Sequence, residues 1–95
     1  MKQPAIYILS NKSNSVLYIG VTSNLVQRIF QHKNKMLEGF TKKYNATKLV
    51  YFEQYEDMYD AILREKRLKQ WKRAWKERLI YESNPNWVDL YDEIT

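Results

Sequence analysis

The order of hydrophobic and polar residues at the start of the chain predicts a β-hairpin. Residues 4–9 and 16–21 are rich in β-branched and aromatic side chains, and a polar turn cluster separates them. With Tyr7 paired opposite Tyr18, the two-residue repeat of a strand places both tyrosines and Gly20 on one face. The other face then carries apolar side chains that can pack into a core, namely Ile6, Ile8, Leu17 and Ile19.

A helix and a third strand are predicted next. Thr22-Ser23-Asn24 supplies capping side chains for a helix over residues 24–36. Its apolar stripe is expected to comprise Leu25, Ile29 and Met36. Residues 37–47 are expected to form a loop, and residues 48–55 have the composition of a strand.

Two further helices are predicted in the second half of the chain. Asp57 can cap a helix that runs to about Trp71, and another is expected over residues 72–83, where Asn84-Pro85 ends it. Their apolar line is expected to comprise Ala61, Ile62, Leu68, Trp71, Trp75 and Leu79. Residues 86–95 are expected to add a last turn, with Trp87 and Leu90 packing back on the core.

The predicted element order is β-β-α-β-α-α in a single domain over residues 1–95. Because a sheet of three strands needs cover on at least one face, we expect an α/β layered fold in which helices supply that cover.

Composition narrows the class of protein. Apolar residues make up 44% and aromatic residues 15%, which excludes a disordered chain. The absence of cysteine excludes disulfides, zinc–thiolate sites and a cysteine nucleophile, and it favours a cytoplasmic location. A single histidine, His32, excludes sites that need two histidine ligands. No apolar run approaches the roughly 18 residues of a membrane span, so we expect no membrane partner.

The net charge of +5 is placed unevenly along the chain. Residues 64–78 hold eight Lys or Arg in fifteen positions, whereas residues 82–95 hold four acidic and no basic residues. Such a basic run forms either an ordinary solvated helix face or a surface that binds phosphates. On the second interpretation, the expected DNA contacts are Lys42, Lys43, Arg64, Lys66, Arg67, Lys69, Lys72 and Arg73.

Five polar residues on otherwise apolar elements carry the candidate chemistry: Tyr7, Tyr18, Arg28, His32 and Glu65. Nucleophilic triads and glycine-rich phosphate loops are excluded, because the chain has one histidine, no cysteine and two glycines. Taken singly, each of the five is typical of core packing, a surface pair or a salt bridge within a helix.

Together the five residues fit the hydrolysis of a phosphodiester. Arg28 can stabilise the negative charge that gathers on the phosphoryl oxygens. One carboxylate with waters, such as Glu65, suffices to hold Mg²⁺. The attacking water needs a proton acceptor. A tyrosine whose pKa neighbouring cations lower can serve, and so can a histidine; the residues leave the choice open.

The spacing of two short motifs carries a resemblance. Ala5-Ile6-Tyr7, ten intervening residues and Tyr18-Ile19-Gly20 resemble the signature of the GIY-YIG nuclease superfamily, with alanine in place of the first glycine. Arg28, His32 and Glu65 fall where that superfamily has an arginine, a histidine or tyrosine, and a metal-binding glutamate. Segments 39–45 and 64–71 resemble a small single-domain bacterial branch, which is similar to the nuclease domain of the excision-repair subunit that makes one incision.

The resemblance implies a three-stranded antiparallel sheet and an endonuclease that hydrolyses DNA with one Mg²⁺ or Mn²⁺. Carried over, Glu65 would hold the metal, Arg28 would stabilise the phosphoryl charge, and Tyr7 or Tyr18 would activate or position the attacking water with support from His32. DNA structure or damage would direct cleavage with weak sequence preference, as in DNA repair, and RNA stays an alternative substrate.

Two rival functions are open from the sequence alone. A nucleic-acid-binding adaptor would keep the fold and the basic surface with little or no turnover. A membrane-surface helix over residues 66–78, with Trp71 and Trp75, is the other. For the nuclease, a targeting partner protein or a second copy of the chain could supply the specificity that a lone catalytic domain lacks. The glutamate on the apolar line favours the nuclease.

Overall fold

A computed structural model describes residues 3–95, which form three strands and five helices. The strands are β1 (Ala5–Ser10), β2 (Leu17–Thr22) and β3 (Lys48–Gln54). The helices are α1 (Leu25–Lys33), α2 (Phe40–Lys43), α3 (Met58–Gln70), α4 (Arg73–Ser83) and α5 (Tyr91–Ile94). The predicted order of strands and main helices is therefore confirmed, with α2 and α5 as short additions.

The sheet is antiparallel with strand order β2-β1-β3, so β1 is the buried centre and β2 has a free edge. The predicted pairing of Tyr7 with Tyr18 is wrong, because Tyr7 pairs with Gly20. The side chain of Asn11 accepts hydrogen bonds from the backbone N–H groups of Ser15 and Val16, which keeps both residues in the turn. The shift is an even number of residues, so every side chain keeps its predicted face.

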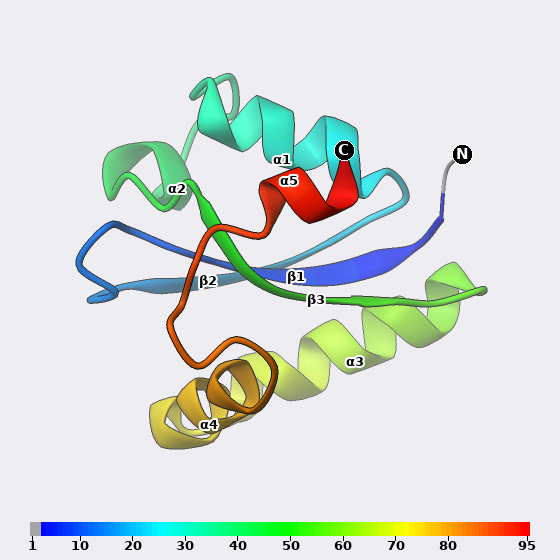
Figure 1. Ribbon diagram of the computed structural model, residues 1–95. Coiled ribbons are helices and arrows are strands. Elements are labelled where there is room, and N and C mark those ends of the chain that lie inside the picture. The colour runs from blue at the N-terminus through cyan, green and yellow to red at the C-terminus, as the bar shows by residue number, and fades with distance from the viewer. Residues whose placement is uncertain (1–2) are drawn as a thin grey trace.

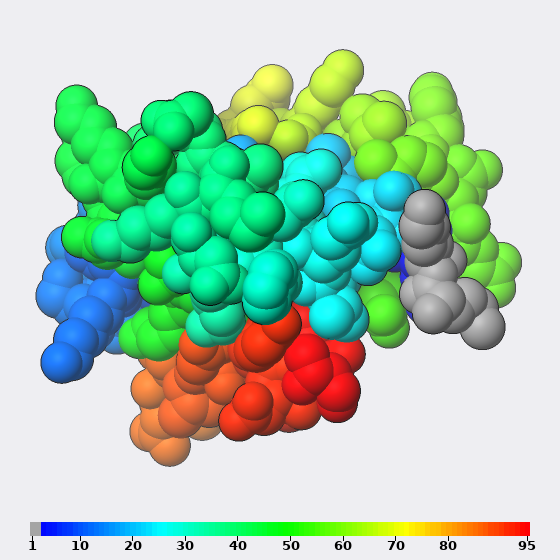
Figure 2. Space-filling model, turned by 90° about the horizontal axis from the view of Figure 1, so that it is seen from above, coloured from blue at the N-terminus to red at the C-terminus, as the bar shows by residue number. Residues whose placement is uncertain are grey.

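Helices cover both faces of the sheet (Figure 1). The face under α1 and α5 holds a core cluster that includes Ala5, Tyr7, Leu9, Leu25 and Ile29. The opposite face packs its isoleucines and Val50 against α3 and α4. Figure 2 shows α1 and the C-terminal segment side by side over the first face, with side chains of α3 emerging beyond the far margin of α1.

Capping residues set the ends of the helices where the sequence placed them. The Asn24 side chain accepts a hydrogen bond from the N–H of Gln27 at the start of α1. Asp57 accepts one from the N–H of Tyr59 at the start of α3. Asn84 ends α4, and its side chain binds the backbone of Val50 and Val88. The side chains of Asn24 and Asp57 thus satisfy backbone N–H groups that a helix start leaves unpaired, whereas that of Asn84 ties the end of α4 to β3 and to the following loop.

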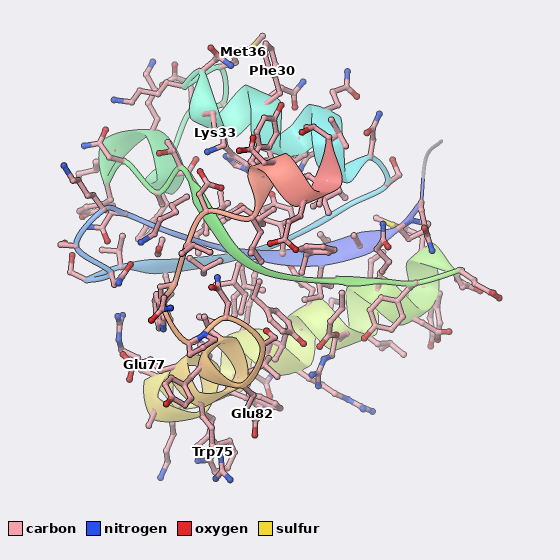
Figure 3. The ribbon with its side chains drawn as sticks, in the orientation of Figure 1. Phe30, Lys33, Met36, Trp75, Glu77 and Glu82 are labelled. Carbon is pink, nitrogen blue, oxygen red and sulfur yellow. The ribbon has the colours of Figure 1, made fainter. Side chains whose placement is uncertain are left out.

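Two predicted core positions are exposed instead. The helix predicted over residues 24–36 ends at Lys33, because Lys35 adopts a left-handed φ of 53°. Met36 then lies 60% exposed rather than on the apolar stripe. Trp75 is 56% exposed. The extended backbone of Trp71 ends α3, and α4 begins as a separate helix, so Trp75 does not continue the apolar face of α3. Figure 3 shows Phe30, Met36 and Trp75 pointing away from the sheet.

The region predicted as a loop over residues 37–47 contains α2, which sits near the start of β3. The predicted last turn is present as α5, and Trp87 and Leu90 pack against the two core clusters as expected. Over residues 3–95, no helix has the length and apolar character that crossing a bilayer requires.

Candidate active site

Tyr7 lies across Gly20 on the neighbouring strand. The two residues pair directly in the sheet, and a Cβ atom added to Gly20 would come within 2.3 Å of the Cζ and Oη atoms of Tyr7. A glycine is therefore required at this position for the phenol to reach the edge of the sheet. The two short motifs of the sequence are thus parts of one arrangement: Gly20 leaves the space that the Tyr7 side chain fills.

The Tyr7 phenol begins a buried chain of hydrogen bonds. Its Oη lies 2.9 Å from Nε2 of His32, and Nδ1 of His32 lies 2.9 Å from Oγ1 of Thr41 in α2. His32 and Thr41 are each only 4% exposed. Tyr18 completes the group, with its ring centroid 6.3 Å from that of Tyr7 and 5.8 Å from that of His32.

Burial and a neighbouring cation set the protonation of this chain. Burial, joined by the nearby Tyr18, raises the pKa of Tyr7 to about 12, while the Arg28 guanidinium beside the phenol opposes the rise. Burial and the positive charge of Arg28 lower the pKa of His32 to about 4. At neutral pH the phenol therefore keeps its proton and the imidazole is uncharged.

Arg28 is a half-buried cation in α1 with no carboxylate partner among residues 3–95, as no salt bridge of the described chain includes it. Its charge acts on both Tyr7 and His32. A partly desolvated guanidinium normally has an anionic partner. The position of Arg28 therefore suits an anion that arrives from outside the chain.

Glu65 approaches the same group from the opposite layer. It lies on the sheet-facing side of α3, its side chain is 12% exposed, and Nζ of Lys69 is 2.8 Å from its carboxylate. The negative charge of Glu65 contributes to the raised pKa of Tyr7. Tyr7 belongs to the α1 layer, and Lys69, the partner of Glu65, lines one pocket with Tyr18 and with both faces of β2, so the two layers come together at the free edge of β2. The structure thus brings together all five predicted residues of the candidate chemistry.

One carboxylate is the available protein ligand for a metal here. No cluster of three His, Cys, Asp or Glu side chains exists within residues 3–95. This donor set fits Mg²⁺ or Mn²⁺, which bind one or two carboxylates and fill the other positions with water and phosphate. A closed zinc site would need more ligands. A cation at Glu65 would displace the ammonium of Lys69, whose side chain is 52% exposed and can turn away.

The predicted DNA contacts divide between the site and other surfaces. Lys69 lies at the site because it pairs with Glu65. Lys66 follows Glu65 by one residue, so it lies about 100° around α3 from Glu65, on the side away from Arg64. Arg64 is committed elsewhere, since its guanidinium binds both carboxylate oxygens of Glu53 on β3 and stacks over Trp71. Arg67 lines the same distant surface pocket as Glu53 and Arg64.

The remaining predicted contacts lie on α2 and at the start of α4. Lys42 pairs with Glu38, and the Lys43 ammonium lies 5.3 Å from the ring centroid of Tyr44. Lys72 is the exposed residue before α4. Arg73 pairs with Glu77 and donates a hydrogen bond to the backbone carbonyl of Asn14 in the hairpin turn.

Three residues near the site were missed by sequence reasoning. Thr41 holds the far nitrogen of His32, Phe40 stacks on Tyr18 with ring centroids 6.0 Å apart, and Lys76 lines a pocket with both of those aromatic residues. Phe40 and Thr41 lie in α2, which was predicted as loop. The spacing of Phe40 and Tyr44 by four residues is the signal of a helical turn that would have indicated it.

The match to known proteins agrees with this geometry. The model of the family described as GIY-YIG catalytic domain matches residues 3–78, which include the tyrosines, the arginine, the histidine and the glutamate of the site. The chain belongs to the GIY-YIG family. That assignment implies a nuclease-like activity with a nucleic acid as substrate, and members of the family generally use a divalent metal.

Curated relatives of the GIY-YIG chain carry the name UPF0213. A UPF0213 protein of Clostridium perfringens is 41% identical over 75 residues, which is 79% of this chain and 80% of that protein. One of Staphylococcus saprophyticus is 34% identical over 82 residues, covering 86% of this chain and 99% of that protein. The solution structure of a UPF0213 protein from Bacillus halodurans has the same fold, with a TM-score of 0.58, 24% identity and 92% of each chain covered.

Proposed function

We propose that this GIY-YIG protein is a metal-dependent endonuclease that hydrolyses DNA phosphodiester bonds at the free edge of β2. The observation that carries the proposal is the grouping of Arg28, which has no carboxylate partner among residues 3–95, with the Tyr7–His32–Thr41 chain and the nearly buried Glu65. Phosphodiester hydrolysis needs a cation that binds the phosphate, a proton acceptor for the attacking water and a carboxylate that holds a metal.

Arg28 binds the scissile phosphate in this mechanism. As water attacks, a new bond forms between its oxygen and phosphorus while the bond from phosphorus to the leaving oxygen breaks. Negative charge then builds on the phosphoryl oxygens, and the guanidinium stabilises it in a setting largely shielded from bulk water. A Mg²⁺ or Mn²⁺ ion held by Glu65 would supply further positive charge at the phosphate.

The Tyr7–His32 pair receives the proton of the attacking water. The two pairs are each 2.9 Å apart. In this mechanism neutral His32 carries its proton on Nδ1, so the phenol of Tyr7 donates to Nε2 and Nδ1–H donates to Oγ1 of Thr41. The proton from water passes to the Tyr7 oxygen as the Tyr7 proton passes to Nε2. The charge of Arg28 helps to hold the pKa of His32 near 4, so a bound phosphate, by offsetting that charge, makes His32 a better acceptor. The leaving oxygen takes a proton from solvent.

The test is cleavage of labelled DNA as single strand, duplex, flap and four-way junction, and of RNA, with Mg²⁺ or Mn²⁺. We expect Glu65→Gln to abolish cleavage while the unfolding temperature is unchanged, and Arg28→Ala to lower kcat at least about 100-fold with a smaller effect on DNA affinity. Glu77→Gln is the matched control, because Glu77 is a helical glutamate that, like Glu65, pairs with a basic side chain four residues away, here Arg73 in α4, and it should cleave as the wild type does.

Two results would overturn the proposal in different ways. Metal-dependent cleavage retained by Glu65→Gln would remove Glu65 as the metal ligand. Salt-sensitive DNA binding with no cleavage of any substrate would assign the wild-type chain to the adaptor function instead. The relatives carry the UPF0213 name, so the finer resemblance to the excision-repair nuclease domain, and a role in DNA repair, stay predictions that the preferred substrate will test.

A further inference from the structure

A row of three aromatic side chains leads away from the site toward solvent. The rings of Tyr18 and Phe40 are stacked within 24° of parallel, and the centroids of Phe40 and Tyr44 are 4.7 Å apart. Phe40 is 41% exposed and Tyr44 is 42% exposed. The candidate site includes Tyr18 from this row, packed on Tyr7 and His32, but the proposed mechanism gives the two exposed rings on and just after α2 no role.

A pocket of about 270 Å³ lies against this row at the free edge of β2. Residues from both faces of the strand line it, so it opens along the edge rather than into either layer. Its lining residues are Leu17, Tyr18, Ile19, Phe40, Lys69 and Lys76. The pocket therefore combines an apolar floor, an aromatic wall and two ammonium groups.

That combination of groups fits one class of occupant. Aromatic faces beside lysines are the means by which proteins hold unpaired nucleotides, with the base stacked on a ring and the phosphates near the cations. The Lys43 ammonium, 5.3 Å from the ring centroid of Tyr44, extends the positive charge along the row. A purely apolar ligand would make no use of the two ammonium groups that line the pocket.

The pocket adjoins the position proposed for the scissile phosphate. Tyr18 lines the pocket and packs on Tyr7 and His32, while Lys69 lines it and pairs with Glu65. A group in the pocket is thus the immediate neighbour of the group bound by Arg28. In an intact duplex the neighbouring base is stacked and paired, and it cannot enter a side pocket without leaving the helix.

We infer that the edge pocket receives an unpaired nucleobase next to the scissile phosphate, stacked on Phe40, so that the protein selects DNA with an unpaired nucleotide at the cleavage site. The inference rests on the proposed nuclease function and names its substrate class. Weak sequence preference follows from it, because every base has a face that can stack.

The experiment compares a duplex with the same duplex carrying a short single-stranded flap, with 2-aminopurine at the first unpaired position. Binding is measured in EDTA, so that no strand is cut. We expect the flap DNA to bind more tightly and its fluorescence to be quenched by stacking. Phe40→Ala should weaken flap binding about fivefold to 150-fold and remove the quenching while duplex binding is unchanged. Phe40→Trp, which keeps an aromatic ring, should retain both the tighter binding of flap DNA and the quenching.

Phe30→Ala is the matched control, because Phe30 is a phenylalanine with 50% exposure that points away from the sheet on α1 (Figure 3). It should bind the flap DNA as the wild type does. Equal weakening of flap and duplex binding by Phe40→Ala, or no weakening, would overturn the pocket. Cleavage by the wild type in Mg²⁺ or Mn²⁺ is read separately. If the wild type cleaves no DNA but still quenches the fluorescence, the proposed nuclease function is wrong and the proposed base-binding role of the pocket is supported.

Discussion

At the residue scale, His32 links the stability of the fold to pH. Its pKa is about 4 in the folded chain and close to 6.5 when unfolded, because folding buries the imidazole beside the charge of Arg28. Below pH 6.5 the unfolded chain binds a proton that the folded chain does not. The stabilisation is therefore complete above pH 6.5 and is lost as pH falls toward 4, by about 3 kcal/mol in all.

Thermal unfolding of the wild type and of His32→Gln between pH 7.5 and 5 measures this link. The unfolding temperature of the wild type should fall with pH over this interval, and that of the variant should fall much less. Burial raises the pKa of the Glu53 carboxyl, but hydrogen bonds from Arg64 and two tyrosines outweigh burial and hold that pKa below its usual value, so Glu53 titrates below this interval. Parallel pH profiles for the two proteins would contradict a neutral, buried His32.

Gly20 is a second residue on which the geometry of the site depends, because its lack of a side chain leaves room for the Tyr7 ring. Gly20→Ala would place a methyl group 2.3 Å from the Tyr7 ring, so Tyr7 must move. We expect a loss of about 1–3 kcal/mol of stability from overpacking, together with loss of cleavage. Denaturant unfolding checks the first effect. In a Tyr7→Leu background, where the ring is absent, the same substitution should cost clearly less; an unchanged cost would place the strain elsewhere.

At the scale of elements, capping residues made several helix ends predictable from the sequence. Features that depend on contacts between distant residues were not predictable in this way. Asn24, Asp57 and Asn84 are local signals, and the helices start or end at them as predicted. The register of the hairpin depends on hydrogen bonds of the Asn11 side chain, which the alternation of apolar and polar residues cannot reveal. The exposure of Trp75 depended on a backbone break at Trp71 that helical periodicity alone runs through.

The same division holds for the candidate site. Motif spacing identified the five side chains that the structure brings together, because strand and helix periodicity places each on a definite face. Thr41 and Phe40 escaped notice, since α2 has four residues and too little sequence to show a period. Arg64 looked equal to its basic neighbours, and its commitment to Glu53 is visible in the tertiary structure alone.

Arg64 fixes one element to another. It joins α3 to β3 by two hydrogen bonds to Glu53, which also accepts hydrogen bonds from the hydroxyls of Tyr51 and Tyr55. Arg64→Ala should cost about 2 kcal/mol in denaturant unfolding, because both partners are largely removed from water. DNA binding and cleavage below the unfolding transition should be unchanged. A stable variant with weakened DNA binding would return Arg64 to the nucleic-acid surface.

At the scale of the whole molecule, the basic surface has two sides with different partners. Toward the free edge of β2, Lys69 and Lys76 line the pocket, and Lys66 follows Glu65 on the side of α3 away from Arg64. On the other side, Arg67 and Arg78 line pockets that they share with acidic residues, Glu53 and Asp60 in one and Glu82 in the other. The net charge of +5 alone does not distinguish the sides. Glu65 at the β2 edge is the proposed metal ligand, whereas Glu53, Asp60 and Glu82 offset the arginines of the other side, so we expect phosphates to bind at the β2 edge.

The salt dependence of DNA binding in EDTA tests this partition with charge-matched variants. Each phosphate neutralised on duplex DNA contributes about −0.9 to the slope of log affinity against log salt concentration. Lys66→Gln with Lys76→Gln removes two charges from the β2 edge, so the slope should become shallower by up to about 1.8. Arg67→Gln with Arg78→Gln removes two charges from the other side and should leave the slope as in the wild type. Equal changes in both variants would show that DNA contacts the whole basic surface, since the released counterions would then come from either side.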